Sequence, residues 1–347
     1  APCSVDNATD MERVSPLWLG IGISGTLILI LLVTETLLGR WGAILIAGEF
    51  DAFAKVSSGP LRDLRIAIVH CLQAGYLPAA FLYVLQTSRR TVFVLKDSLD
   101  CTTEECETLA DSIRLNPRWL LLIGLIAVTV SIAGPYIVPP VPVAPWDPTT
   151  WSSEVVWHRL LGPVTQVWAW WLGFAVVVVS VRMSNIARKL SSINLLDLSP
   201  LTPFTQLGLT NALMLIGSLS IWSLMTLETG FGAMMIVIGG TTLVSSAVAL
   251  LLPVRGVHQR IRQAKDAELG WVNGEISSLR NQIKSKDSRA QSGDLADLVA
   301  YRGLIDGVHE WPFTTSTFTR LFLYALIPVA SWGIGIVAEE IIGRMLF

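Results

Sequence analysis

Residues 207–253 decide the fold class; they read LGLTNALMLIGSLSIWSLMTLETGFGAMMIVIGGTTLVSSAVALLLP. Two long apolar runs, 207–226 and 231–253, are separated by four residues that include Glu228, the one charged residue of the whole stretch. A helix that crosses the hydrocarbon core of a bilayer needs about 20 mostly apolar residues. Each run is long enough, and the short link predicts that the two spans form an antiparallel hairpin.

Four further runs of similar length and hydropathy flank this hairpin. The sequence therefore predicts an all-α fold, a polytopic transmembrane helix bundle with six spans favoured and seven possible, together with a cytoplasmic helical hairpin. The predicted order is an exported N-terminal segment 1–16, span 1 at 17–38, a cytoplasmic or interfacial region 39–118, spans 2–5 within 119–253, the cytoplasmic hairpin 254–317, and span 6 with the C-terminus at 318–347.

Composition supports a membrane location. The 347 residues are 52% hydrophobic and 15% charged, with a mean hydropathy of +0.57, whereas soluble domains carry about 25% charged residues. This composition excludes a disordered chain and argues against a freely soluble globule. The net charge of -2 gives no global basic surface, so we expect no nucleic-acid partner.

A seventh apolar stretch, 66–85, is ambiguous because it contains His70, Gln73, Gly75 and Pro78. Lysine and arginine near span ends bias a loop to the cytoplasm. If 66–85 does not cross, 22 of the 25 basic residues are cytoplasmic and both termini lie outside; if it crosses, the split is 19 to 6 and the N-terminus lies inside. The first arrangement fits better, so we expect 66–85 to be re-entrant or interfacial, with an extra span as the alternative.

This topology exports residues 1–16. Two alternatives remain open for the start at Ala1: removal of a signal peptide, with which an exported N-terminus agrees, or a position inside a longer sequence. It also places tryptophans where indole rings favour the headgroup region. We interpret seven of them as interface anchors: Trp146, Trp151, Trp157, Trp168, Trp170, Trp171 and Trp311.

The stretch 254–309 predicts a cytoplasmic helical hairpin. Its apolar residues recur at helical steps of three, four and seven among charged ones, for example at Ile261, Leu269, Val272 and Ile276. We expect this apolar stripe to be covered by the returning helix or by residues 39–118, in preference to a second subunit.

The chain lacks the usual signatures of catalysis. It contains no HExxH, GxxxxGK[ST] or GxGxxG motif, and we expect no enzyme activity, cofactor or metal. The small residues of Gly22-Ile23-Ser24-Gly25 favour close helix packing. Cys101 and Cys106 lack zinc-site spacing, and because the favoured topology places them in a reducing compartment, we expect no disulfide.

Polar residues at membrane depth are costly unless they are paired or wet. His70 and Gln73 are three residues apart and share a helical face, so they are the best candidates for a cavity lining. Asn211 and Glu35 are the other two candidate lining residues at membrane depth. Their alternative roles are structural: Asn211 would bridge helices as a buried amide, and Glu35 would reach towards Arg40.

From these features we expect a multi-pass protein of the cell membrane with its main soluble mass in the cytoplasm, in contact with the lipid bilayer. The leading interpretation is a subunit of a channel-like or transport-related homo-oligomer. The alternative is a membrane-anchored scaffold or signalling subunit that binds a cytoplasmic protein through its helical hairpin. An enzyme that acts on lipid within the membrane is a third class, supported only by scattered polar residues.

Overall fold

The computed structural model describes residues 14–37, 60–137, 153–191, 193–224, 233–284, 292–313, 316–317, 319–328 and 330. Within these residues the regular structure is entirely helical. The elements, in chain order, are α2 (Pro16–Leu37), α4 (Pro60–Val94), α5 (Lys96–Leu99), α6 (Thr103–Asp111), α7 (Pro117–Ile137), α8 (Ser153–Ala187), η2 (Ser199–Leu201), α9 (Thr202–Ser223), α10 (Ala233–Lys284) and α11 (Ser292–Asp306). A further apolar helix, Thr319–Pro328, follows α11.

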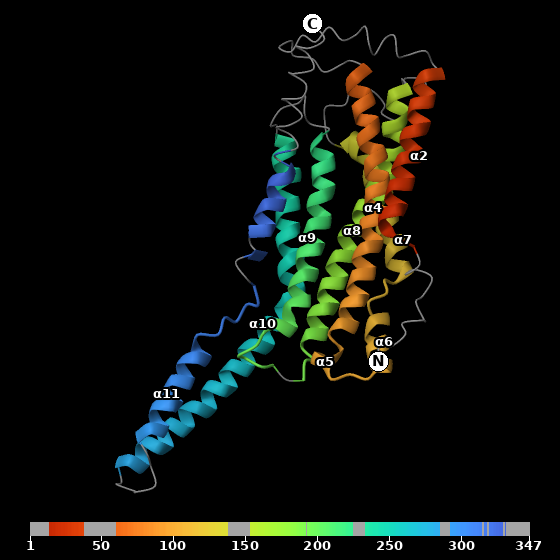
Figure 1. Ribbon diagram of the computed structural model, residues 1–347. Helices are drawn as coiled ribbons and strands as arrows, with labels where there is room; N and C mark the ends of the chain where they lie inside the picture. Colours follow the sequence, from red (N-terminus) through yellow and green to blue (C-terminus); the bar gives the residue numbers. More distant parts are fainter. Residues whose placement is uncertain are drawn as a thin grey trace.

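The long helices pack side by side in a bundle, and five of them, α2, α4, α8, α9 and α10, are long and apolar enough to cross a membrane (Figure 1). The helix α4 is central, since 67% of its most apolar stretch is buried, against 6% for the peripheral helix α2. The apolar parts of α7 and of the last helix are shorter, Pro117–Ala133 and Thr319–Pro328. These helices coincide with the apolar runs predicted from the sequence.

Residues 66–85, expected to be re-entrant or interfacial, lie within one continuous helix, because α4 runs unbroken through both Gly75 and Pro78. Gly75 faces α2 so closely that a Cβ there would collide with Ser24 and with the backbone of Gly20. Glycine therefore serves helix packing at this position and does not break the helix. Proline is tolerated inside helices of membrane proteins, where neighbouring groups satisfy the freed carbonyl.

Close helix contacts also join α8, α9 and α10. A Cβ on Gly208 of α9 would lie 2.6 Å from the carbonyl oxygen of Leu250, and one on Gly256 of α10 would collide with the carbonyl of Ser184. Small residues let helix backbones approach where lipid offers no hydrophobic driving force. The backbones of α8, α9 and α10 thus approach one another closely at these two glycines.

The chain after α11 runs along α9 in the same direction. Thr205 Oγ1, near the start of α9, donates a hydrogen bond to the carbonyl of Pro312, and Ser223 Oγ, at its end, donates one to the carbonyl of Pro328. The last described helix consequently ends beside the end of α9, on the side of the bundle away from α5 and α6 (Figure 1). Trp146 and Trp151, together with 331–338 of the predicted last span, lie outside the described residues.

The predicted helical hairpin is present as α10 and α11, which project from one end of the bundle (Figure 1). The helix α10 has 52 residues, or about 78 Å at 1.5 Å per residue, and includes both the apolar run and the charged continuation. Tyr301 of α11 donates a hydrogen bond of 2.9 Å to Glu268, which raises the pKa of Tyr301. Val272 and Ile305 are buried between the helices, so the returning helix covers part of the stripe.

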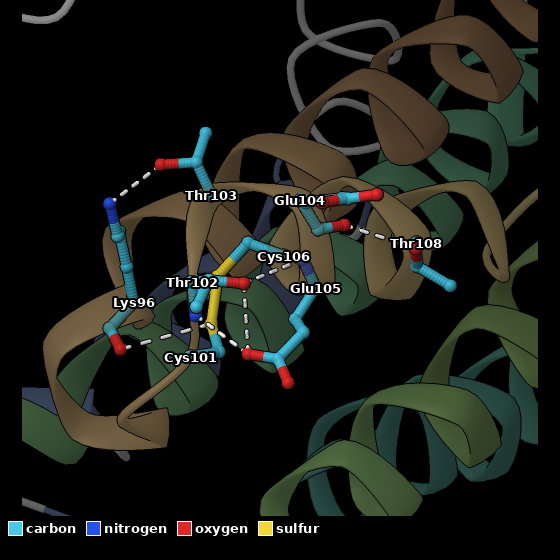
Figure 2. The surroundings of a disulfide bond; sticks show 8 residues. All are labelled: Lys96, Cys101, Thr102, Thr103, Glu104, Glu105, Cys106 and Thr108. Carbon is cyan, nitrogen blue, oxygen red and sulfur yellow. Dashed lines mark hydrogen bonds between the residues drawn. A yellow bond between two sulfur atoms is a disulfide. The ribbon is translucent and has the colours of Figure 1, made fainter.

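The bundle end from which the hairpin projects, here called the hairpin end, also holds α5 and α6. Contrary to expectation, Cys101 and Cys106 form a disulfide, with Cα atoms 6.0 Å apart (Figure 2). Thr102 begins α6 with a capping box, since its hydroxyl accepts from the Glu105 N–H and its own N–H donates to the Glu105 carboxylate. The cap turns the chain back on itself and brings Cys106, on the first turn, over Cys101.

An ion pair fixes α6 against the central helix. Arg89 of α4 is buried and donates to Asp111 at 3.1 Å, and Arg114 lies 3.2 Å from the same carboxylate oxygen. The hairpin end of the bundle is therefore held by a disulfide, a helix cap and an arginine–aspartate cluster.

Candidate functional site

A line of polar side chains runs along the contact between α4 and α9. His70, Gln73 and Tyr76 of α4 are spaced by three residues, and they face Trp222, Ser218 and Met214 of the antiparallel helix α9. We call these six residues the α4–α9 seam. His70 and Gln73 lie together on it, as their spacing predicted.

His70 occupies the end of the seam farther from the hairpin end. Its side chain is 1% exposed, and Nδ1 lies 2.8 Å from the carbonyl oxygen of Ile66, one turn back on α4. The imidazole edge meets the Trp222 ring at a centroid distance of 5.8 Å. His70 is thus packed between α4 and α9, where a backbone carbonyl and an indole ring contact its imidazole.

Gln73 and Ser218 exchange two hydrogen bonds at the middle of the seam. The Gln73 Nε2 donates to the carbonyl oxygen of Ser218 at 2.7 Å, and the Ser218 hydroxyl donates to Gln73 Oε1 at 3.3 Å. The amide thus bridges the two helices through both of its polar atoms. In a bilayer such a bridge removes an otherwise costly polar group from lipid.

Tyr76 completes the seam and was not singled out from the sequence, although its spacing of three from Gln73 places it on the same face. Its hydroxyl donates to the carbonyl oxygen of Met214 at 2.9 Å. Gly217 leaves room for the ring, since a Cβ at that position would collide with the Tyr76 hydroxyl.

Asn211 lies outside the seam and faces α8. It is fully buried, its Nδ2 donates to Ser180 Oγ at 3.3 Å, and its Oδ1 has no hydrogen-bond partner among the described residues. The amide therefore bridges α8 and α9, which agrees with the helix-bridging role expected for it. A buried acceptor of this kind is a position where an ordered water molecule can bind.

Glu35 is also remote from the seam. It is buried in the last turn of α2, one turn from the buried Leu31. Its expected partner, Arg40, lies outside the described residues. The structure therefore does not gather the four predicted lining residues into one cavity: two share the seam, and the other two lie on different helix contacts.

The tryptophan anchors divide in a similar way. Trp168 and Trp171 lie near the middle of α8, where their rings meet at 4.9 Å and Trp171 Nε1 donates to the carbonyl of Leu120 in α7. Trp157 is also partly buried and packs on the smaller core around Leu31. Trp170 and Trp311, by contrast, are 38% and 39% exposed.

An apolar groove of about 590 Å³ lies beside the seam, between α2, α4 and α9. We call it the α2–α9 groove. Its volume falls within the range of about 300–1,000 Å³ that is usual for ligand sites. Tyr76 belongs to both the seam and the groove. Ser24 of α2 also lines the groove, and its hydroxyl donates a hydrogen bond to the carbonyl oxygen of Leu72 at 3.4 Å. The remaining wall includes Leu17, Ile21, Tyr83 and Ile221.

The groove was not predicted, because it arises where three helices separated in sequence diverge. Two of its α2 residues, Leu17 and Ile21, are 66% and 52% exposed, so the groove opens on the outer surface of the bundle. No group of three or more His, Cys, Asp or Glu that could hold a metal lies in the described part of the chain.

The chain matches no protein-family model, and comparisons with curated proteins and with solved structures find no match either.

Proposed function

We propose that this chain is an integral membrane protein of the transport-related class, and that it takes a lipid-like molecule into the α2–α9 groove from the surrounding bilayer. The observation that carries the proposal is the groove itself, an apolar space of about 590 Å³ open on the outer face of helices long enough to cross a membrane. A molecule that enters the groove from this side would come from the hydrocarbon core of the bilayer.

The packing of the seam favours this proposal over an aqueous pore through one protomer. Gln73 and Ser218 satisfy each other, and Tyr76 satisfies itself on the backbone of Met214. Polar side chains that line a water-filled path leave donors and acceptors available to water or solute, whereas the polar atoms of Gln73, Ser218 and Tyr76 hydrogen-bond between α4 and α9. A channel-like path would then have to lie between protomers of a homo-oligomer, for which the sparsely buried α2 offers a face.

We further propose that α4 crosses the membrane, as do the helices on either side of it. Its length and hydropathy support this, as does the reversal of direction from α2 to α4 and from α4 to α7 (Figure 1). The corresponding distribution of lysine and arginine is 19 to 6, with the larger number at the hairpin end. The positive-inside rule then places the hairpin end and the start of α2 in the cytoplasm of a cell-membrane protein.

The test uses a substitution that fills the groove without disturbing the core. Ile21→Trp places an indole at the exposed rim, and Ile30→Trp is the matched control, because Ile30 is 48% exposed and lies two and a half helical turns away, on the opposite face. Proteoliposomes are assayed for movement of a fluorescent phospholipid between leaflets, read by quenching with an impermeant reductant.

We expect movement above that of protein-free vesicles, a several-fold reduction with Ile21→Trp, and no reduction with Ile30→Trp. Equal movement with and without protein would contradict the proposal. So would equal effects of the two substitutions, because the groove would then have no part in the movement.

A second function, the scaffold, is favoured by the hairpin surface. Trp271 of α10 and Val299 and Leu304 of α11 are 54%, 53% and 63% exposed, and the hairpin projects away from the bundle (Figure 1). A photo-crosslinking residue at Trp271, compared with one at the exposed polar position Arg280, tests this in cells. A single protein crosslinked at Trp271 and lost in the Leu304→Asp variant would support the scaffold; equal crosslinking from both positions would contradict it.

A further inference from the structure

A second groove lies on α10 where the helix passes from apolar to charged sequence. It has a volume of about 430 Å³ and is lined by residues at helical steps of three and four along one face of α10, with Trp311 across from them. We call it the α10 cationic groove. The residues of α10 that line it are Val248, Leu251, Leu252, Arg255, His258, Gln259 and Arg262.

The two ends of this groove differ in chemistry. At the end within the bundle, Val248 and Leu251 are 44% and 42% exposed, and in a bilayer they would face hydrocarbon. At the hairpin end, Arg255 and Arg262 follow on the same face, about 10 Å apart along the axis because they are separated by seven residues. The groove thus offers an apolar surface that continues directly into a cationic one.

The positive charge is only partly neutralised. Arg255 is exposed and forms no ion pair or side-chain hydrogen bond with any of the residues whose positions are described. Arg262 has one weak contact, 4.0 Å to Asp266, with both side chains mostly exposed. Glu310 is the remaining carboxylate nearby, and it lies 4.0 Å from His258 Nε2.

The opposite wall is held in place by stacking. The rings of His258 and Trp311 lie nearly parallel, with centroids 4.2 Å apart, and Trp311 stacks in turn on Phe313. His258 Nδ1 lies 3.2 Å from the backbone carbonyl of Glu310, and Gln259 accepts a hydrogen bond from Arg188. An indole held at the boundary between apolar and charged surface is typical of the headgroup region of a membrane.

We propose that the α10 cationic groove binds an anionic phospholipid. Arg255 takes the phosphate, Arg262 attracts the remaining negative charge of the headgroup, and an acyl chain lies along Val248 and Leu251. Basic pockets beside transmembrane helices at the cytoplasmic side recognise anionic headgroups in this way. A zwitterionic lipid brings its own cation towards two arginines and is therefore disfavoured.

The test is native mass spectrometry of the purified full-length chain in an uncharged detergent. Phosphatidylglycerol is titrated against phosphatidylcholine with identical acyl chains, and soluble glycerol phosphate is added as a competitor that has no chains. The variants are Arg255→Gln, Arg255→Lys and, as a matched control, Arg280→Gln, which removes an exposed charge from the same helix outside the groove.

We expect phosphatidylglycerol to bind more tightly than phosphatidylcholine. Arg255→Gln should weaken the binding of phosphatidylglycerol about fivefold, which is the effect of one basic residue near a lipid surface. Arg255→Lys should retain most of this binding, and Arg280→Gln should leave it unchanged. Equal binding of the two lipids would overturn the proposal. Equal effects of Arg255→Gln and Arg280→Gln, or full competition by glycerol phosphate, would overturn it too, because each would mean charge alone without a lipid site.

The inference is independent of transport through the α2–α9 groove. The two grooves share no lining residue, and lipid binding is read by mass and not by movement between leaflets. Failure of one proposal therefore leaves the other testable.

Discussion

The contact between α2 and α4 makes a sharp prediction about a single methyl group. A Cβ added at Gly75 would collide with Ser24 Oγ and the carbonyl oxygen of Gly20, and would lie 2.9 Å from the backbone nitrogen of Ser24. From the other side, a Cβ on Gly20 would lie 3.0 Å from that of Ala79. Because backbone atoms of α2 form this contact, the whole helix must shift to admit a side chain.

The magnitude follows from a comparison with Gly22, which has no heavy atom within 4 Å of its added Cβ. Replacing glycine by alanine in a helix gains about 1 kcal/mol of propensity at an unhindered position, and this gain is common to both sites. Overpacking a fitted contact costs about 1–3 kcal/mol. We therefore expect Gly75→Ala to be less stable than Gly22→Ala by about 1–3 kcal/mol.

The assay is unfolding of the two purified variants in detergent micelles by increasing dodecyl sulfate, followed by circular dichroism, with the parent chain alongside. The free energies of unfolding are compared at the same micelle composition. If Gly75→Ala were as stable as Gly22→Ala, the close approach of α2 and α4 would be refuted, and with it the shape of the α2–α9 groove.

Three further predictions concern polar contacts. In a double-mutant cycle, Gln73→Leu and Ser218→Ala should show a coupling free energy of about 0.6 kcal/mol, and not above about 1.7 kcal/mol. Because the backbone carbonyl of residue 218 remains in Ser218→Ala, the cycle measures the bond from the Ser218 hydroxyl to Gln73, and a coupling of zero in the same unfolding assay would contradict that bond. The pKa of Glu105 is lowered because the backbone of Thr102 hydrogen-bonds its carboxylate, so the cap stabilises α6 above the ordinary pKa of glutamate and this stability is lost as the pH falls through the lowered value. Glu105→Gln removes the titrating carboxylate and should therefore flatten the acid limb of an unfolding-versus-pH curve. An unchanged limb would count against the capping box. Asp111→Ala removes the carboxylate that pairs with the buried Arg89. Breaking a fully buried ion pair costs about 3–5 kcal/mol, and the cost is smaller here because the Asp111 side chain is 52% exposed. Backbone hydrogen exchange in residues 103–111 should rise, and unchanged exchange would contradict the role of this ion pair in holding α6 against α4.

Patterns that depend on one segment alone were predictable from the sequence. The apolar runs, the helical hairpin and the shared face of His70 and Gln73 need only length, hydropathy and helical spacing, and the structure contains each of them. The close packing expected of Gly22-Ile23-Ser24-Gly25 is present at Ser24, which contacts Gly75, whereas a Cβ on Gly22 or Gly25 would meet no heavy atom within 4 Å.

Features that depend on the contact between two segments were not predictable from the sequence. Gly75 and Pro78 signal a broken helix when α4 is considered alone, and only the approach of α2 shows why a glycine is needed there. The same holds for the α2–α9 groove, which requires the relative positions of three helices. The partial burial of Trp157, Trp168 and Trp171 depends on packing against neighbouring helices, which a count of aromatic residues does not contain.

The disulfide and the basic residues bear on the same question, the side of the membrane on which the hairpin end lies. Disulfides persist in oxidising compartments and are transient in reducing ones, whereas 19 of the 25 basic residues assign this end to the cytoplasm if α4 crosses. The charge pattern carries more weight, since it sums over four separate segments of the chain, while Cys101 and Cys106 are five residues apart and meet whenever the cap at Thr102 forms. In a reducing compartment the bond would open, and the capping box and the contact between Arg89 and Asp111 would still hold α6 in place. The proposed cytoplasmic location of the hairpin end therefore does not depend on whether the disulfide persists.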